Sequence, residues 1–162
     1  MTKVITPDQT MFESAYCTRC GGSGKFSFNL KDGNRCYGCS GSGVQLTNRG
    51  KAAKAFYIES QQMSVADLKP GMFVWDTTIG RAPKFLRILS IEQSQAYSIS
   101  NGERHYYTDI RTSRGTCGVF ATSKVRAVEG EEQRQAQIAA ALAYQASLTK
   151  AGKPAKKVLE AA

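Results

Sequence analysis

The chain contains one eight-residue pattern twice, as CTRCGGSG at residues 17–24 and as CYGCSGSG at residues 36–43. In each copy two residues separate two cysteines, a spacing that lets two thiolates approach one metal ion from a tight turn. Fifteen residues lie between the two cysteine pairs, within the usual interval for zinc sites of this kind. The sequence therefore predicts one Zn²⁺ per chain, bound by four thiolates: Cys17, Cys20, Cys36 and Cys39.

Glycines end each copy of the pattern at equivalent positions, where the backbone must turn without obstructing the sulfur atoms. They are Gly22, Gly24, Gly41 and Gly43. Between the copies, Phe26, Phe28 and Leu30 alternate with polar residues before the turn sequence KDGN. Alternation followed by a glycine turn predicts a β-hairpin between the two cysteine pairs.

The two CxxCxGxG repeats resemble the cysteine-rich zinc domain of DnaJ-type chaperones, over residues 16–45 only. That family typically has four repeats and two zinc ions, whereas this chain has two repeats. The sequence contains no His-Pro-Asp tripeptide, the mark of the J domain, and its one histidine is His105. Two-repeat fingers of this kind are also similar to those of small basic phage and bacterial proteins. The resemblance implies a zinc finger whose partner is either a nucleic acid or a polypeptide.

Four cysteine ligands leave a zinc ion no open position for a catalytic water, so we expect a structural metal and no enzymatic activity. Thiol–disulfide exchange by the two pairs is an alternative, but the sequence lacks a thioredoxin-like context for it. Neither Cys117 nor His105 has a catalytic partner at a matching spacing. We expect Cys117 to be a buried small residue.

The chain is basic, with a formal net charge of +9, which favours an acidic partner such as nucleic acid. Residues 1–57 carry eight basic and three acidic residues, so the excess is concentrated in the first third. The sequence has neither a long apolar segment nor an apolar signal core at its start. We therefore predict a cytoplasmic protein without a membrane partner, in a reducing compartment where paired cysteines bind metal.

The expected strands and helices, which must position the cysteines and the basic residues, indicate an α+β fold. Residues 1–45 are interpreted as the zinc finger with its β-hairpin, and residues 46–62 as a basic helical connector. Four to five short strands, separated by turn residues, predict a small antiparallel β-barrel or curved sheet over residues 63–128. Trp75 is interpreted as a core anchor of this sheet. Acidic residues at the start predict a C-terminal helix at 129–149, before a basic flexible tail at 150–162.

Basic and aromatic side chains in the finger, the connector and the sheet are candidates for phosphate contacts and base stacking. We predict binding of single-stranded or structured DNA or RNA with low sequence specificity. The alternative is an adaptor that binds a polypeptide, as a chaperone-like protein or a host-directed phage regulator would. The candidate nucleic-acid-binding residues are Arg19, Lys25, Lys31, Arg35, Tyr37, Arg49, Lys51, Lys54, Arg104, Tyr106, Arg111 and Arg114.

Overall fold

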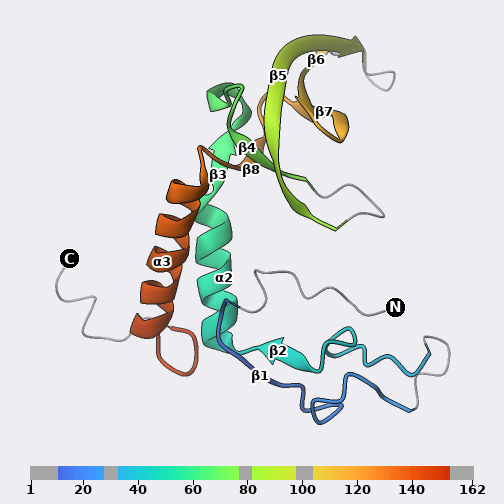
Figure 1. Ribbon diagram of the computed structural model, residues 1–162, viewed down its shortest axis with the longest axis vertical. Coiled ribbons are helices and arrows are strands. Elements are labelled where there is room, and N and C mark those ends of the chain that lie inside the picture. The colour runs from blue at the N-terminus through green and yellow to red at the C-terminus, as the bar shows by residue number, and fades with distance from the viewer. Residues whose placement is uncertain (1–10, 28–32, 77–81, 98–103, 154–162) are drawn as a thin grey trace. The chain divides into compact units, whose positions relative to one another are not determined.

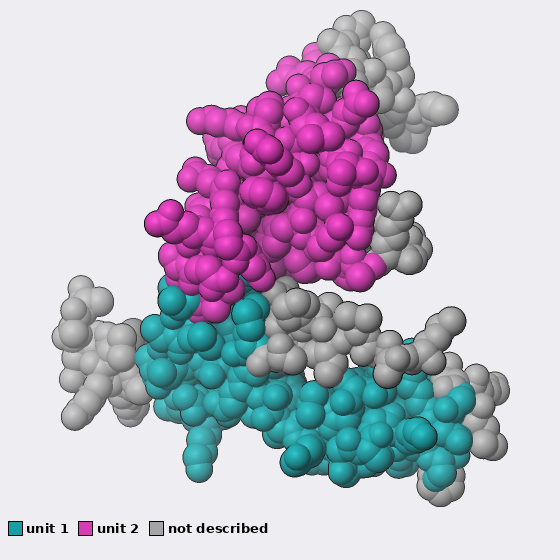
Figure 2. Space-filling model, in the orientation of Figure 1, with its two compact units in different colours: residues 1–57, 139–162 teal, residues 58–138 magenta. Residues whose placement is uncertain are grey.

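The computed structural model describes residues 11–27, 33–76, 82–97 and 104–153 of the chain. The chain divides into two compact units, shown in different colours in Figure 2. Unit 1 comprises residues 1–57 and 139–162, and unit 2 comprises residues 58–138. Helices and antiparallel strands occur together, so the predicted α+β class is confirmed.

Two short strands bracket the cysteine repeats in unit 1. Strand β1 (Ser14–Tyr16) pairs antiparallel with β2 (Val44–Leu46). Between the repeats, a single antiparallel bridge joins Lys25 and Arg35. The tip of the predicted hairpin, residues 28–32, lies outside the described residues. The pairing of β1 with β2 closes the finger at its base. This pairing was not predicted from the sequence.

Among the described residues, α2 (Asn48–Ser60) and the C-terminal part of α3 (Glu131–Ser147) contribute helices to unit 1. Helix α2 begins after Thr47, whose hydroxyl accepts a hydrogen bond from the N–H of Gly50 at 3.1 Å, as a helix cap does. Ala53 and Tyr57 lie four residues apart on one face of α2, and both are fully buried. The rings of Tyr57 and Phe12 are 5.9 Å apart. The contact between Phe12 and Tyr57 joins the last turn of α2 to the chain that leads into the finger.

Helix α3 occupies residues 131–147, within the range predicted for a C-terminal helix. Glu131 and Glu132 stand in its first turn, where negative charge complements the helix dipole. Ile138, Ala141 and Leu148 are buried at helical spacing.

Six antiparallel strands form the sheet of unit 2, in the order β3-β8-β4-β5-β6-β7 (Figure 1). The 3₁₀ helix η2 (Val65–Asp67) follows the first of these strands and begins after Ser64, whose hydroxyl accepts from the N–H of Ala66. The strands are β3 (Gln62–Ser64), β4 (Phe73–Asp76), β5 (Lys84–Tyr97), β6 (Arg104–Thr112), β7 (Gly115–Phe120) and β8 (Lys124–Val128).

Alternating side chains of these strands bury one face of the sheet, which we call the inner face. Val65, Leu68, Met72, Ile88, Ile110 and Ala127 form its buried cluster. Val74 pairs with both Leu86 and Ala127 in the strand register, which places all three on this inner face. We call the opposite side the outer face.

The sheet is open. Of the two predicted alternatives, a small barrel and a curved sheet, the structure agrees with the curved sheet. Strands β3 and β7 stand at the two edges and do not pair with each other within the described residues. Strand β5 bends along its length (Figure 1), and its register with β6 shifts between Ile88 and Ser90. An irregularity of this kind increases the local twist of a strand.

Candidate metal centre

The two cysteine repeats of unit 1 hold each other through a reciprocal pair of backbone hydrogen bonds. The N–H of Cys17 donates to the carbonyl of Gly43 at 2.8 Å, and the N–H of Cys36 donates to the carbonyl of Gly24 at 3.0 Å. Each donor is the first cysteine of one repeat, and each acceptor is the last glycine of the other. The two repeats therefore make equivalent backbone hydrogen bonds to each other.

A serine fixes the turn of each repeat in the same way. Ser23 donates its hydroxyl to the carbonyl of Cys20, and Ser42 to the carbonyl of Cys39, both at 2.7 Å. Each serine N–H donates to the same carbonyl at 3.1 Å. These local bonds satisfy the backbone of two turns that have no helix or sheet partner.

Glycine is required at the last position of each repeat for two reasons. Gly24 and Gly43 have φ values of +71° and +79°, a region that other residues rarely adopt. A Cβ at Gly24 would also collide with the carbonyl of Gly41, and a Cβ at Gly43 with the carbonyl of Gly22. The two backbones thus approach too closely for any side chain between them.

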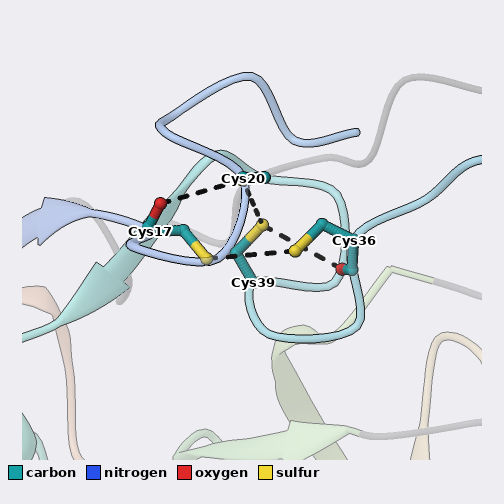
Figure 3. A group of neighbouring side chains, drawn as sticks. All are labelled: Cys17, Cys20, Cys36 and Cys39. Carbon is teal, nitrogen blue, oxygen red and sulfur yellow. Dashed lines mark hydrogen bonds between the residues drawn. The ribbon is translucent and has the colours of Figure 1, made fainter. Parts of the chain in front are cut away.

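This packing brings the four cysteine sulfurs together in one cluster (Figure 3). The Sγ atoms of Cys17 and Cys36 are 3.9 Å apart and those of Cys20 and Cys39 are 3.7 Å apart. All four ligand atoms lie within 4.8 Å of one another. Tetrahedral sulfur ligands at about 2.3 Å from a metal are about 3.8 Å from each other, so the cluster fits a four-coordinate ion.

The local electrostatics favour thiolates at the second cysteine of each repeat. The N–H of Gly43 donates to Sγ of Cys39 at 3.2 Å. Burial alone would raise the pKa of Cys39, but this and other hydrogen bonds outweigh it and lower the pKa to about 6. At Cys20, burial again raises the pKa, and hydrogen bonds led by the N–H of Gly24 lower it overall. Burial raises the pKa of the Cys17 thiol. The second cysteine of each repeat therefore has a lowered pKa.

Among the predicted finger contacts, Arg19 stands beside two aromatic rings. Its guanidinium carbon lies 4.5 Å from the ring centroid of Phe26 and 5.9 Å from that of Tyr37. Lys25 is exposed. Arg35 donates from Nε to the carbonyl of Ser40 at 2.9 Å, so it also supports the second repeat. Lys31 lies outside the described residues.

Two other predicted basic residues are engaged in structural contacts. Arg49 forms an ion pair with Glu13 at 3.3 Å and donates to the carbonyl of Gln145. Arg114 pairs with Asp76 at 2.7 Å and donates to the carbonyl of Ala82. Both link segments that are far apart in the sequence.

The remaining candidates lie on α2 and on the sheet. Lys51 is exposed and lines a shallow pocket of about 300 Å³ beside Cys39. Lys54 is half-buried on α2. Tyr106 and Arg111 are exposed on β6. Arg104 begins β6, and its side chain is outside the described part of the chain.

The structure also corrects two expectations from the sequence. Cys117 is exposed, not buried, and lines an apolar pocket on the inner face of the sheet. Trp75 is only half-buried and lies on the outer face, since its neighbour Val74 occupies the inner face. Strand alternation in FVWD could have shown that Val74 and Trp75 point to opposite sides, but not which side is the core.

The sequence did not predict that Trp75, Phe85 and Arg126 form a cluster. The Trp75 and Phe85 rings meet edge to face at 4.9 Å, and the Arg126 guanidinium lies 4.5 Å from the Trp75 ring. No local motif joins these residues, which come from β4, β5 and β8. Their pairing in the strand register brings them together.

Comparison with protein-family models, with curated proteins and with solved structures finds no match to this chain. Within the described residues, no helix has the length and apolar character needed to cross a membrane. The site must therefore be interpreted from its own geometry and chemistry.

Proposed function

We propose that the protein is a non-enzymatic nucleic-acid-binding protein whose finger is stabilised by one zinc ion. Four buried or half-buried sulfurs at tetrahedral distances support a closed metal site, and an all-thiolate set is typical of structural zinc. Four sulfur ligands leave no coordination position for a substrate or a reactive water. The ordered turns around the metal would then serve to present the finger's surface, which fits a structural role.

The observation that carries the nucleic-acid proposal is the grouping of Arg19 with exposed aromatic rings on this finger. Tyr37 is 56% exposed beside Arg19, and Tyr16, at the base of the finger, is 79% exposed. Large aromatic side chains at such exposure supply faces on which bases stack. Arg19, held beside Phe26 and Tyr37, adds positive charge where a phosphate would pass.

The charge of the finger supports the same proposal. In sequence, residues 14–46 carry four basic residues, Arg19, Lys25, Lys31 and Arg35, and one acidic residue, Asp32. A segment with an excess of positive charge attracts a polyanion, and each neutralised phosphate adds affinity through counterion release. Single-stranded or structured nucleic acid suits exposed rings better than a duplex, whose bases are already stacked.

Fluorescence anisotropy with labelled single-stranded DNA, duplex DNA and RNA tests this function. If about four phosphates are contacted, affinity for a single strand should fall about 50-fold between about 50 and 200 mM salt. The double variant Arg19→Gln/Lys25→Gln should lower the slope of log affinity against log salt by about 1.4. Lys69→Gln, an exposed site in unit 2, is the matched control. Absence of binding at low salt would overturn the proposal.

Polypeptide binding is the second candidate function, and a pocket in unit 2 favours it. The pocket has a volume of about 390 Å³ and is lined by apolar side chains that include Val74, Ile110 and Val119. Such a pocket can accept an apolar side chain of a partner. Affinity that depends on apolar burial responds weakly to salt, so the salt titration separates this function from nucleic-acid binding.

A further inference from the structure

The outer face of the sheet in unit 2 carries aromatic and basic side chains on four neighbouring strands. In the register of β4 and β5, Trp75 lies opposite Phe85 and Phe73 lies opposite Arg87. These positions alternate with the inner-face residues Val74 and Leu86, so they point away from the core. We define the Trp75 face by the following residues: Trp75, Phe85, Arg87, Arg111, Lys124 and Arg126.

The centre of the Trp75 face is held in a fixed arrangement. Arg126 lies over Trp75 at 4.5 Å and near Phe85 at 5.8 Å. Its Nε and Nη2 donate to Oε1 of Gln61 at 3.0 and 2.6 Å, and Gln61 is only 1% exposed. The buried amide therefore fixes the guanidinium, and the guanidinium fixes the indole. Little side-chain entropy remains to be lost when a flat ligand stacks there.

Charge is unevenly distributed along the outer face. Arg87 is exposed two residues after Phe85 on β5, Lys124 is exposed two residues before Arg126 on β8, and Arg111 is exposed on β6 opposite Ser90. The acidic residues Glu92 and Asp109 pair with each other further along β5 and β6. The part of the face around Trp75 and Phe85 is therefore basic, and the part beyond Arg111, which also contains Tyr107 and Phe120, is acidic.

We propose that the Trp75 face binds a single strand of nucleic acid, with a base stacking against Phe85 and Trp75. Arg87, Arg111 and Lys124 would neutralise the flanking phosphates, and Arg126 is a positioning residue that orients the indole. This inference rests on the proposed function and adds a second contact surface to the finger. The complementarity between the basic half of this face and a polyanion identifies the occupant.

The chain provides its own reporter, because Trp75 is its one tryptophan. Titration of zinc-loaded full-length protein with unlabelled oligo-dT or oligo-U should quench tryptophan fluorescence in parallel with the anisotropy change of the same labelled strand. The two oligonucleotides distinguish DNA from RNA. Strand binding that leaves Trp75 fluorescence unchanged would overturn this inference while leaving the proposed function intact. Absence of strand binding at low salt would overturn both.

Substitutions separate stacking from charge. Phe85→Leu should weaken single-strand affinity about tenfold, as expected for one lost stacking ring. Phe120→Leu is its matched control, since Phe120 pairs with Tyr107 on the acidic half of the same face. Equal losses in the two variants would contradict the proposal.

The double variant Arg87→Gln/Arg111→Gln changes exposed side chains only, so folding is not at risk. It should reduce the salt slope by about 1.4 and reduce Trp75 quenching at a fixed strand concentration. An unchanged slope would overturn the phosphate assignment. Equal quenching by a polyglutamate peptide would also contradict the proposal, because it would show a general preference for acidic polymers.

Discussion

The finger and the sheet of this protein are organised around interiors of different chemistry. The buried cluster of the finger consists of Cys17, Cys36 and Cys39, with Cys20 and Phe26 against it. The buried cluster of the sheet is aliphatic and draws on residues from 63 to 127. Neither cluster contains a residue of the other. Under the proposed function, a zinc ion stabilises the finger and burial of apolar surface stabilises the sheet, so each region should respond to perturbations that leave the other unaffected.

Metal removal should separate the two regions most strongly. Chelation, or Cys36→Ser, should remove the one zinc per chain and unfold the finger, because structural zinc contributes about 10–16 kcal/mol in isolated finger peptides. Hydrogen exchange should show lost protection in residues 14–46 and retained protection in β4 to β8. Simultaneous loss of protection in the sheet would contradict the independence of the two regions, since it would show that the sheet depends on the metal.

Cavity formation in the sheet should give the converse result. Ile88→Ala should lower the free energy of unfolding by about 2–5 kcal/mol, because Ile88 is 1% exposed within the aliphatic cluster. Leu89→Ala is the control, since this neighbouring side chain is 55% exposed and should change stability little. Thermal unfolding followed by Trp75 fluorescence reports the sheet, while mass spectrometry reports zinc content. Zinc loss in Ile88→Ala would contradict the independence of the two regions.

Glycine substitutions should show how far zinc binding depends on the close approach of the two repeats. Gly43→Ala should destabilise the zinc-bound finger by about 2–4 kcal/mol, because it combines a positive φ with a backbone collision. Gly21→Ala shares the positive φ but meets no atom within 4 Å, so about 1 kcal/mol is expected. Competition with a zinc chelator measures both variants. Equal zinc affinities would show that close approach of the repeats is unimportant.

Loss of an ion pair in the sheet should have the smallest effect. Arg114→Gln removes the ion pair between Arg114 and Asp76, whose side chains are 16% and 17% exposed. We expect a loss of about 1–2 kcal/mol, between the values for exposed and buried pairs. Urea unfolding monitored by Trp75 fluorescence checks this, with zinc content unchanged. The double variant Arg114→Gln/Asp76→Asn should recover part of the loss, and failure to recover it would point to a role outside this pair.

Local patterns in the sequence predicted a substantial part of this architecture. The cysteine spacing identified the four sulfurs that the fold brings together, because a CxxC turn positions both of its thiols within four residues. Acidic residues at the start and apolar residues at helical spacing identified α3. Alternation and turn residues predicted an antiparallel sheet after the finger.

The side chains available to a partner could not be deduced in this way. Arg49 and Arg114 were predicted to contact phosphates, yet they pair with Glu13 and Asp76 across 36 and 38 positions of sequence. The cluster of Trp75, Phe85 and Arg126 depends on pairing of three strands. Whether the sheet closes also depends on its edge strands.

Local sequence patterns were therefore enough to identify the four clustered cysteines, the glycine turns beside them and the approximate extent of the C-terminal helix. The buried face of the sheet and the ion pairs of the basic residues became apparent only in the three-dimensional structure. The physical reason is the range of the interactions. Thiol spacing and helix periodicity act over a few residues, whereas strand register joins distant segments, and a shift of one residue would exchange the inner and outer faces.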